Sequence, residues 1–372
     1  MAIAISRPEL AVLCACARRS AQMSGLGAMP DAAADVDWDN LLASAEAHGV
    51  TELLLAPLSS SALNVPARIV EQLEQHQLEV TGLSLKRATQ LVGLLRHLSD
   101  HGIRALTFKG PTLAAGAYGH LGRRLSNDLD ILVRRRDISR VRPLLLADGY
   151  TLPARTRHRT GSLAYGLFPG AGRDDTLLPG QPWQTAVDVH IAFAYWTLGI
   201  RLDTNELFDR AVTVDVAGHA VATLCPNDLL LVLAIHGMMH GWAFLRFASD
   251  IDAVAAQITD WDDVIRRAES AHMGRVLRVA LLLTDRLLGT ALPPEVLAWA
   301  ARDQHAVEIA RGAAVRMFEE ARSDDWDPRP WLLSFLERPR DRFGFYARTH
   351  LYEWYLKWPW DEWLGRRSVT RA

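Results

Sequence analysis

The stretch Ser126–Val133, which reads S-N-D-L-D-I-L-V, decides how the rest of the chain is interpreted. Side chains alternate between the two faces of a β-strand, so Asp128 and Asp130 face one side and the aliphatic residues face the other. Two carboxylates about 7 Å apart on one strand repel each other unless they share a cation. Mg²⁺ prefers oxygen ligands and commonly takes one or two carboxylates together with substrate phosphates. The stretch therefore predicts a magnesium site on a strand.

A second acidic strand is predicted at residues 186–192, where Val187–Ile191 reads V-D-V-H-I. The same alternation places Asp188 and His190 on one face of that strand. A third carboxylate on a neighbouring strand would complete a site for two metal ions, one at the attacking oxygen and one at the triphosphate. His190 has two interpretations, a hydrogen-bonded core histidine or a cofactor-binding residue beside the metal that supports a metal ligand or acts as a general base.

Phosphate-binding candidates lie on either side of these strands. Lys109 and Gly110 stand where a strand is expected to meet a helix N-terminus, whose N–H groups and dipole attract phosphate. Arg123 and Arg124 precede the D-x-D, and an arginine there could clamp phosphates. Because these two are adjacent, we expect one to be functional and the other exposed, and we favour Arg124. Ser126 is a further nucleotide-binding candidate.

The pattern of apolar residues predicts an α+β fold in three parts. Residues 1–100 are predicted to be helical, residues 101–225 to form a small α/β core, and residues 226–372 to form a C-terminal helical region. The range 151–185 is interpreted as a long irregular loop with a strand near Ser162–Phe168. The expected strands are 103–108, 128–133 and 186–192, with a hairpin of 212–216 and 220–224. The expected helices include 69–100, 111–118, 137–146, 228–240, 247–257, 261–271, 275–288, 295–318 and 340–356.

Composition narrows the functional class. The 372 residues are 49% hydrophobic and 23% charged, which is typical of a soluble globular protein. A formal net charge of -2 argues against general attraction to nucleic acid. The three cysteines, Cys14, Cys16 and Cys225, do not make a disulfide scaffold and fit a reducing compartment. The apolar stretch Leu10–Ala17 is too short to span a membrane. We therefore expect a cytoplasmic protein that is not bound to a membrane.

Taken together, the runs F-K-G-P-T, G-x-x-x-R, D-L-D-I-L-V and V-D-V-H resemble the nucleotidyltransferase superfamily of the DNA polymerase beta type. The resemblance covers about residues 85–255. It is greatest to a bacterial branch often found beside peptide natural-product clusters, including those for lasso peptides. It implies a mixed sheet with helices on one side, two Mg²⁺ ions (or Mn²⁺) and a nucleoside triphosphate donor. Asp128 and Asp130 match the paired metal ligands, and Asp188 matches the third carboxylate.

The sequence departs from the superfamily pattern at one position, and the resemblance leads to a prediction of the activity. Pro111 stands where the superfamily has the serine of a Gly-Ser pair, and Thr112 would supply a hydroxyl one residue later. The predicted activity is transfer of a nucleotide from ATP to a peptide, protein or small-molecule acceptor. One rival is a catalytically degenerate accessory protein that binds a nucleotide or a peptide. A kinase-like use of the metals is a more distant rival, because the sequence has no G-x-x-x-x-G-K-[ST] run.

Three further features keep two interpretations each. His236 and His240 have metal-ligand spacing but lack the glutamate of a zinc hydrolase, so packing or a position in a cleft is favoured over zinc. Arg246 and Asp250 are spaced for an intrahelical ion pair, and the alternative is that their helix docks against the sheet near the site. The aromatic stretch Phe343–Trp363 is interpreted as helix packing, with stacking on a nucleobase or peptide as the alternative.

Overall fold

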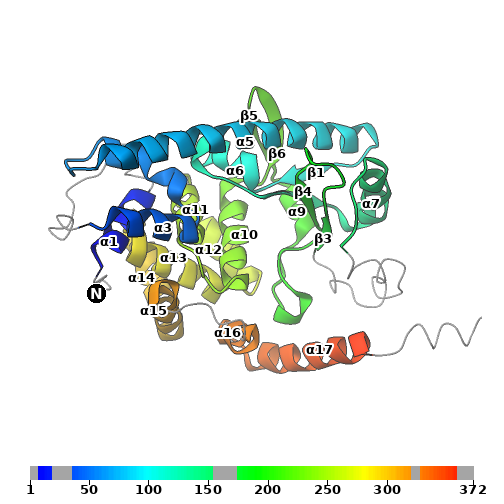
Figure 1. The fold of residues 1–372 in the computed structure, drawn as a ribbon. Helices are drawn as coiled ribbons and strands as arrows, with labels where there is room; N and C mark the ends of the chain where they lie inside the picture. The colour runs from blue at the N-terminus through cyan, green and yellow to red at the C-terminus, as the bar shows by residue number, and fades with distance from the viewer. Residues whose placement is uncertain (1–6, 19–35, 154–173, 320–326, 358–372) are drawn as a thin grey trace, which may run out of the picture.

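The computed structural model describes residues 7–18, 36–153, 174–319 and 327–357. Figure 1 shows a β-sheet placed between one long helix, α5 (Ala67–Asp100), and a bundle of helices formed mainly by the C-terminal part of the chain. The strand expected near Ser162–Phe168 lies outside the described residues, as does the end of the aromatic stretch after residue 357.

Over the described residues, the sheet has six strands in the order β3-β4-β2-β1-β6-β5. The pairs β2–β4 and β1–β6 are parallel and the other pairs are antiparallel, which confirms the predicted mixed sheet and the α+β fold. β3 lies inside the range that was interpreted as an irregular loop, because D-D-T-L is too short and too polar to show strand alternation. The strands are β1 Ala105–Thr107, β2 Asp128–Val133, β3 Asp174–Leu177, β4 Ala186–His190, β5 Val212–Val216 and β6 His219–Thr223.

Helices cover both faces of this sheet, whereas the family resemblance implied one. The C-terminal half of α5 and α7 (Ile138–Ala147) pack on the face that carries Leu129, Ile131 and Val189. On the other face, Leu132 joins the larger core that contains α10 (Pro226–Met239). The aliphatic side of β2 therefore faces a closed core, and its acidic side faces the helical bundle.

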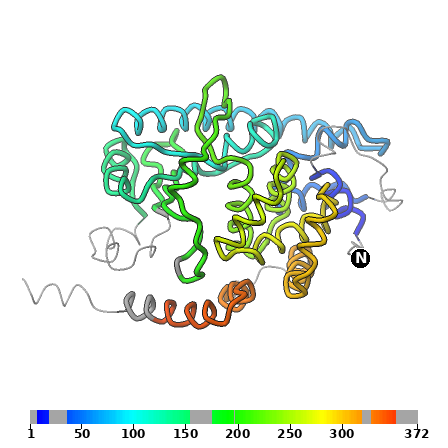
Figure 2. Tube along the Cα trace, turned by 180° about the vertical axis from the view of Figure 1, so that it is seen from behind, coloured from blue at the N-terminus to red at the C-terminus, as the bar shows by residue number. Residues whose placement is uncertain are grey.

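The bundle is built around α10, an apolar helix with most of its residues buried. Helix α1 packs on α3, α11 and α13, so the first helices of the chain share a hydrophobic core with the last ones. Both views show the β5–β6 hairpin projecting past α5 on the side away from the bundle (Figures 1 and 2). The bundle and its surroundings comprise α1 Pro8–Ala17, α3 Trp38–His48, α4 Leu55–Ser59, α9 Thr204–Asp209, α11 Leu245–Ala255, α12 Trp261–Ser270, α13 Gly274–Leu288, α14 Pro294–Ala301, α15 Gln304–Glu319, α16 Pro328–Ser334 and α17 Pro339–Lys357.

One sequence expectation about helix ends is wrong. The helix expected over 295–318 is divided into α14 and α15, because Asp303 accepts hydrogen bonds from the backbone N–H groups of His305 and Ala306 and so begins a new helix. The helix expected from residue 137 begins as predicted, with Asp137 at the N-cap of α7, where its side chain accepts from Arg140. Among the described residues, no helix combines the length and the apolar character needed to cross a membrane.

Candidate metal and nucleotide site

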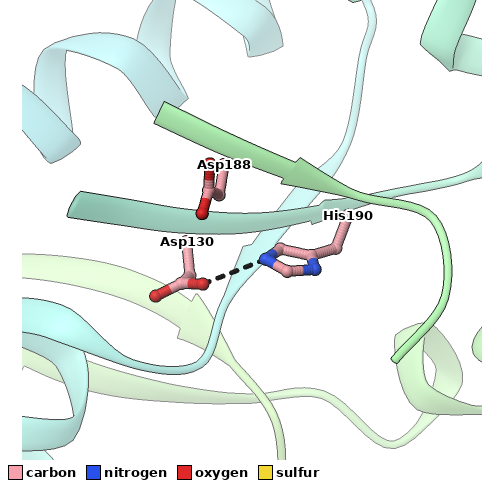
Figure 3. Close-up of side chains that lie close together, drawn as sticks. All are labelled: Asp130, Asp188 and His190. Carbon is pink, nitrogen blue, oxygen red and sulfur yellow. Dashed lines mark hydrogen bonds and ion pairs between the residues drawn. The ribbon is translucent and has the colours of Figure 1, made fainter. Parts of the chain in front are cut away.

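The candidate site begins with the register of two parallel strands. β2 and β4 pair so that Asp130 lies directly opposite Asp188. His190 follows Asp188 by two residues and therefore shares its face. Figure 3 shows the three side chains pointing toward one another. Their ligand atoms all lie within 4.8 Å of one another. The prediction that two neighbouring strands bring their carboxylates together is confirmed.

Asp130 is an ionised carboxylate with one unused oxygen. Its side chain is 2% exposed, and its Oδ1 lies 3.3 Å from Lys109 Nζ and 2.9 Å from His190 Nε2. Its Oδ2 is buried and has no hydrogen-bond partner among the residues that the structure describes. Burial opposes ionisation, but the Lys109 charge and the His190 hydrogen bond outweigh it and hold the pKa of Asp130 well below its usual value. A buried anionic oxygen without a partner is a ligand that fits a divalent cation.

Asp188 lies beside Asp130, but its pKa shifts in the opposite direction. Its side chain is half-buried, and burial raises its pKa. A hydrogen bond with Thr176 works against that rise, while the negative charges of Asp130 and Asp128 add to it. A cation between these carboxylates would remove the repulsion. The donor set therefore fits a divalent metal ion.

Asp128 lies in the same cavity but outside the tight group. It lines the cavity together with Asp130 and Asp188. Its Oδ1 accepts a hydrogen bond of 3.1 Å from Ser126 Oγ, which also lies 2.9 Å from the backbone oxygen of Asp128. The described cluster of ligand atoms contains His190 where the sequence analysis expected Asp128. The role of Asp128 as a metal ligand stays a prediction.

The turn between β1 and α6 (Gly110–Gly116) brings some of the phosphate candidates to the cavity. Lys109 lines it, with Nζ on Asp130. Gly110 has a φ of 58°, a conformation that favours glycine, and a Cβ there would lie 3.6 Å from the backbone oxygen of Asp128. Pro111 lies in the first turn of α6, as expected. Thr112 does not line the cavity, and its buried hydroxyl lies 2.9 Å from that of Thr107.

The two arginines before β2 have different surroundings. Arg124 is buried, lines the cavity and makes two hydrogen bonds, of 2.7 and 2.8 Å, to the carboxylate of Asp250 in α11. Tyr118 donates a further hydrogen bond of 2.8 Å to Asp250. Arg123 donates to the backbone oxygen of Tyr118 and is not among the residues that line the cavity. The interpretation of Arg246 and Asp250 as an intrahelical pair is wrong, and the alternative, docking of α11 near the site, is confirmed.

The wall opposite the carboxylates consists mainly of rings from α10, α11 and the loop between them, and it also includes Arg246 of α11. His236, His240, Phe244 and Phe247 line the cavity, which has a volume of about 330 Å³. Burial, with the charges of Lys109 and His240, holds the pKa of His236 well below its usual value, so its ring is uncharged at neutral pH. The expectation that His236 and His240 face a cleft is confirmed. Neither belongs to the ligand group found among the described residues.

The two phenylalanines of this wall, Phe244 and Phe247, were not predicted from the sequence. Phe244 and Phe247 follow β2 by more than a hundred residues, and a phenylalanine in an amphipathic helix predicts packing rather than a cavity. The only local signal was the pair of histidines on α10, which was interpreted without the rings of α11. The spacing of neighbouring residues therefore could not predict that Phe244 and Phe247 lie beside these histidines.

A mixed sheet that presents in-register carboxylates to a cavity with a basic turn defines a protein suited to bind a metal ion and an anionic ligand. Residues 34–289 match the family described as uncharacterised nucleotidyltransferase, and the chain belongs to this family. Among solved structures, a nucleotidyltransferase-like antigenic protein from Paracoccidioides brasiliensis is 13% identical, with a TM-score of 0.33. That match covers 60% of this chain and 94% of the other. No curated protein matches the chain.

Proposed function

We propose that this protein transfers a nucleoside monophosphate from a nucleoside triphosphate, with ATP as the donor, to an acceptor and releases pyrophosphate. The observation that carries the proposal is the in-register pair Asp130 and Asp188, with a buried Asp130 oxygen that has no partner in the described part of the chain. Membership of the nucleotidyltransferase family supports the reaction class. The cavity volume of about 330 Å³ lies within the usual range for small-molecule sites.

We assign the binding of Mg²⁺ to Asp130, Asp188 and Asp128. Mn²⁺ can replace Mg²⁺ in this proposal, and the proposed number of ions is two. The chemistry supplied by bound divalent cations is neutralisation of charge on the triphosphate and on the leaving pyrophosphate. His190 Nε2 donates to the ionised Asp130 Oδ1 and holds that carboxylate in place. In this role it positions a ligand, as partners of ligating groups commonly do.

The transfer forms a bond between the acceptor oxygen and the α-phosphorus and breaks the bond from the α-phosphorus to the oxygen that bridges to the β-phosphate. The acceptor proton passes to a carboxylate oxygen of Asp188, the more exposed member of the strand pair. Lys109 and Arg124 bring positive charge to the phosphate chain, Lys109 from the start of α6 and Arg124 from the segment before β2.

The acceptor that we propose is a peptide, a protein or a small molecule. The resemblance of the sequence to the branch found beside natural-product clusters, including those for lasso peptides, supports a role in tailoring such a product. The genes that flank this one separate the choices, because a peptide precursor gene beside it favours a peptide acceptor and a small-molecule pathway favours the other.

The test combines metal binding with turnover. The wild type is expected to bind Mn²⁺, as measured by electron paramagnetic resonance, and to release pyrophosphate from ATP in the presence of Mg²⁺. Both the binding and the release are expected to be lost in Asp130→Asn and in Asp188→Asn. Asp262→Asn is the matched control, because Asp262 is exposed on α12 and away from the cavity. Unchanged turnover in both strand variants would contradict the assignment.

A second candidate function is binding of a nucleotide without transfer. It is favoured by the turn after β1, where Pro111 has no N–H to donate and the Thr112 hydroxyl is occupied by Thr107. Calorimetry with a non-hydrolysable ATP analogue and Mg²⁺ discriminates between the two. Binding with no turnover on any acceptor supports the second candidate, and turnover excludes it.

A further inference from the structure

The cavity has two walls of opposite character. The sheet wall carries the aspartates, Lys109 and Arg124, and is charged. The helical wall carries the rings, with an uncharged His236, and one charged side chain, Arg246 of α11. A ligand that fills the whole cavity must therefore have a charged end and a flat apolar end.

The rings of the helical wall form one connected cluster. The ring centroids of His236 and His240 lie 4.4 Å apart, and Phe247 contacts both, at 5.2 Å from His236 and 5.7 Å from His240. Phe244 lies 5.8 Å from Phe247. Such ring pairs at these distances attract one another, and an exposed ring edge or face is a surface on which another planar group stacks.

The loop that carries two of these rings, His240 and Phe244, is held in a strained conformation. Trp242, between α10 and α11, has a φ of 53° and is fully buried. Its indole lies against Gly237, where an added Cβ would come within 2.6 Å of the ring, so only glycine leaves room for it. Backbone strain at a bulky residue persists only where the surroundings enforce it, and it occurs often at functional sites. The packing of Trp242 on Gly237 thus fixes the loop that bears His240 and Phe244.

We infer that His236, His240 and Phe244 form a subsite that stacks on the nucleobase of the donor. The inference rests on the proposed function and names the part of the donor that the helical wall binds. A nucleoside triphosphate has the two ends that the cavity requires, a phosphate chain for the charged wall and a flat uncharged base for the rings. Stacking is tolerant of base identity, because every base has a π-face. The subsite therefore contributes affinity for a nucleotide and little preference among bases.

The experiment compares two ligands that differ by the base and the ribose. Calorimetry with Mg²⁺ measures the affinity of α,β-methylene ATP and of inorganic tripolyphosphate for the full chain. Phe244→Ala is expected to weaken the analogue about tenfold, the effect of losing one stacking ring, and to leave tripolyphosphate unchanged. His240→Ala is expected to act in the same direction. Phe244→Tyr retains a ring and is expected to stay within about twofold of the wild type.

The controls separate a folding defect from a failed inference. Phe343→Ala removes a phenylalanine that is 76% exposed on α17 and outside the cavity, and it should change neither affinity. Thermal melting of each variant reports its folding. Equal weakening of both ligands by Phe244→Ala, or no weakening of the analogue, would overturn the subsite. Failure of the wild type to bind either ligand would overturn the proposed function as well, whereas binding of both without transfer would overturn the proposed function alone.

Discussion

Two aspartates in this molecule are equally buried and have opposite surroundings. Asp228, at the start of α10, is fully buried, and both of its oxygens are paired. Arg210 approaches it with two nitrogens, at 2.9 and 3.1 Å, and Arg267 adds a contact of 2.8 Å. Asp130 is also buried, but within the described ranges only its Oδ1 has partners, and its Oδ2 has none.

The difference separates a structural carboxylate from a ligand-binding one. A buried charge is tolerated when every lone pair is satisfied, as at Asp228. An oxygen left without a partner costs free energy, and such a cost persists where another group is bound there. Partner geometry therefore distinguishes Asp130 from Asp228, although burial alone does not.

The largest expected effect is on activity at Asp130. Asp130→Asn should lower turnover at least about 1,000-fold, because a neutral carboxamide cannot hold the divalent cation. The free energy of unfolding should change by no more than about 1 kcal/mol, since the substitution removes a charge that is only partly paired. Turnover of ATP and urea unfolding measure the two effects. A large loss of stability with retained activity would show that Asp130, like Asp228, is a structural carboxylate.

The converse is expected at Asp228. Asp228→Asn should lower the free energy of unfolding by about 2–4 kcal/mol, because Arg210 and Arg267 lose the anion that neutralises them. Both arginines reach solvent, which keeps the loss at the lower end of the range for broken buried pairs. Urea unfolding gives the stability, and Mn²⁺ binding by the folded fraction should be unchanged. Loss of Mn²⁺ binding in a folded variant would show that Asp228 belongs to the site.

Asp250 lies between these two cases, because it is fully paired but its partner Arg124 lines the cavity. Asp250→Asn should raise the KM for ATP about tenfold and leave kcat within about twofold, since the charge-assisted hydrogen bonds that position Arg124 are weakened. Steady-state kinetics gives the two parameters. Arg124→Lys should have the same direction, because lysine cannot reproduce the two-point contact. A fall in kcat with unchanged KM would assign Arg124 a role other than binding.

The smallest expected effect is a pH dependence in the Asp228 network. Burial raises the pKa of Asp263, but hydrogen bonds from Asn227 and Arg267 outweigh it and lower the pKa. The unfolded chain has a pKa of about 3.9 for this group, so its stabilising contribution is present above that pH and is lost as the pH falls through the lower folded value. Melting temperatures from about pH 6 to about pH 3 should fall less steeply in Asp263→Asn than in the wild type. Identical slopes would show that Asp263 does not titrate with folding.

Part of this site could be predicted from the sequence. Strand alternation gave the bounds of β2 and placed Asp130 and Asp188 on faces that could meet, because a period of two depends only on neighbours. It could not give the register that sets them opposite each other, nor the contact of Lys109 with Asp130, because both depend on how distant strands pair. The pairing of Arg124 with Asp250 spans 126 positions and was not predicted, because local spacing offered only the docking of α11 near the site as an alternative.

Other parts were hidden for local reasons. β3 is a polar segment of four residues, which is too short to show strand alternation. α15 begins where Asp303 caps it, but the pattern of apolar residues continues across this position and therefore does not reveal the boundary. The division of the chain into ranges 1–100, 101–225 and 226–372 stays a prediction. The shared core of α1 and α13 shows that distant ranges pack together, which a division by sequence pattern does not anticipate.

The most direct test of the central claim is the mass of the product. The protein is incubated with ATP, Mg²⁺ and a panel of peptide and small-molecule acceptors, beside Asp130→Asn and Asp188→Asn, and the acceptors are weighed by mass spectrometry. Our account predicts that one acceptor gains the mass of one nucleoside monophosphate with the wild type and with neither variant. A gain of a single phosphate, or an equal gain with Asp130→Asn, would contradict it.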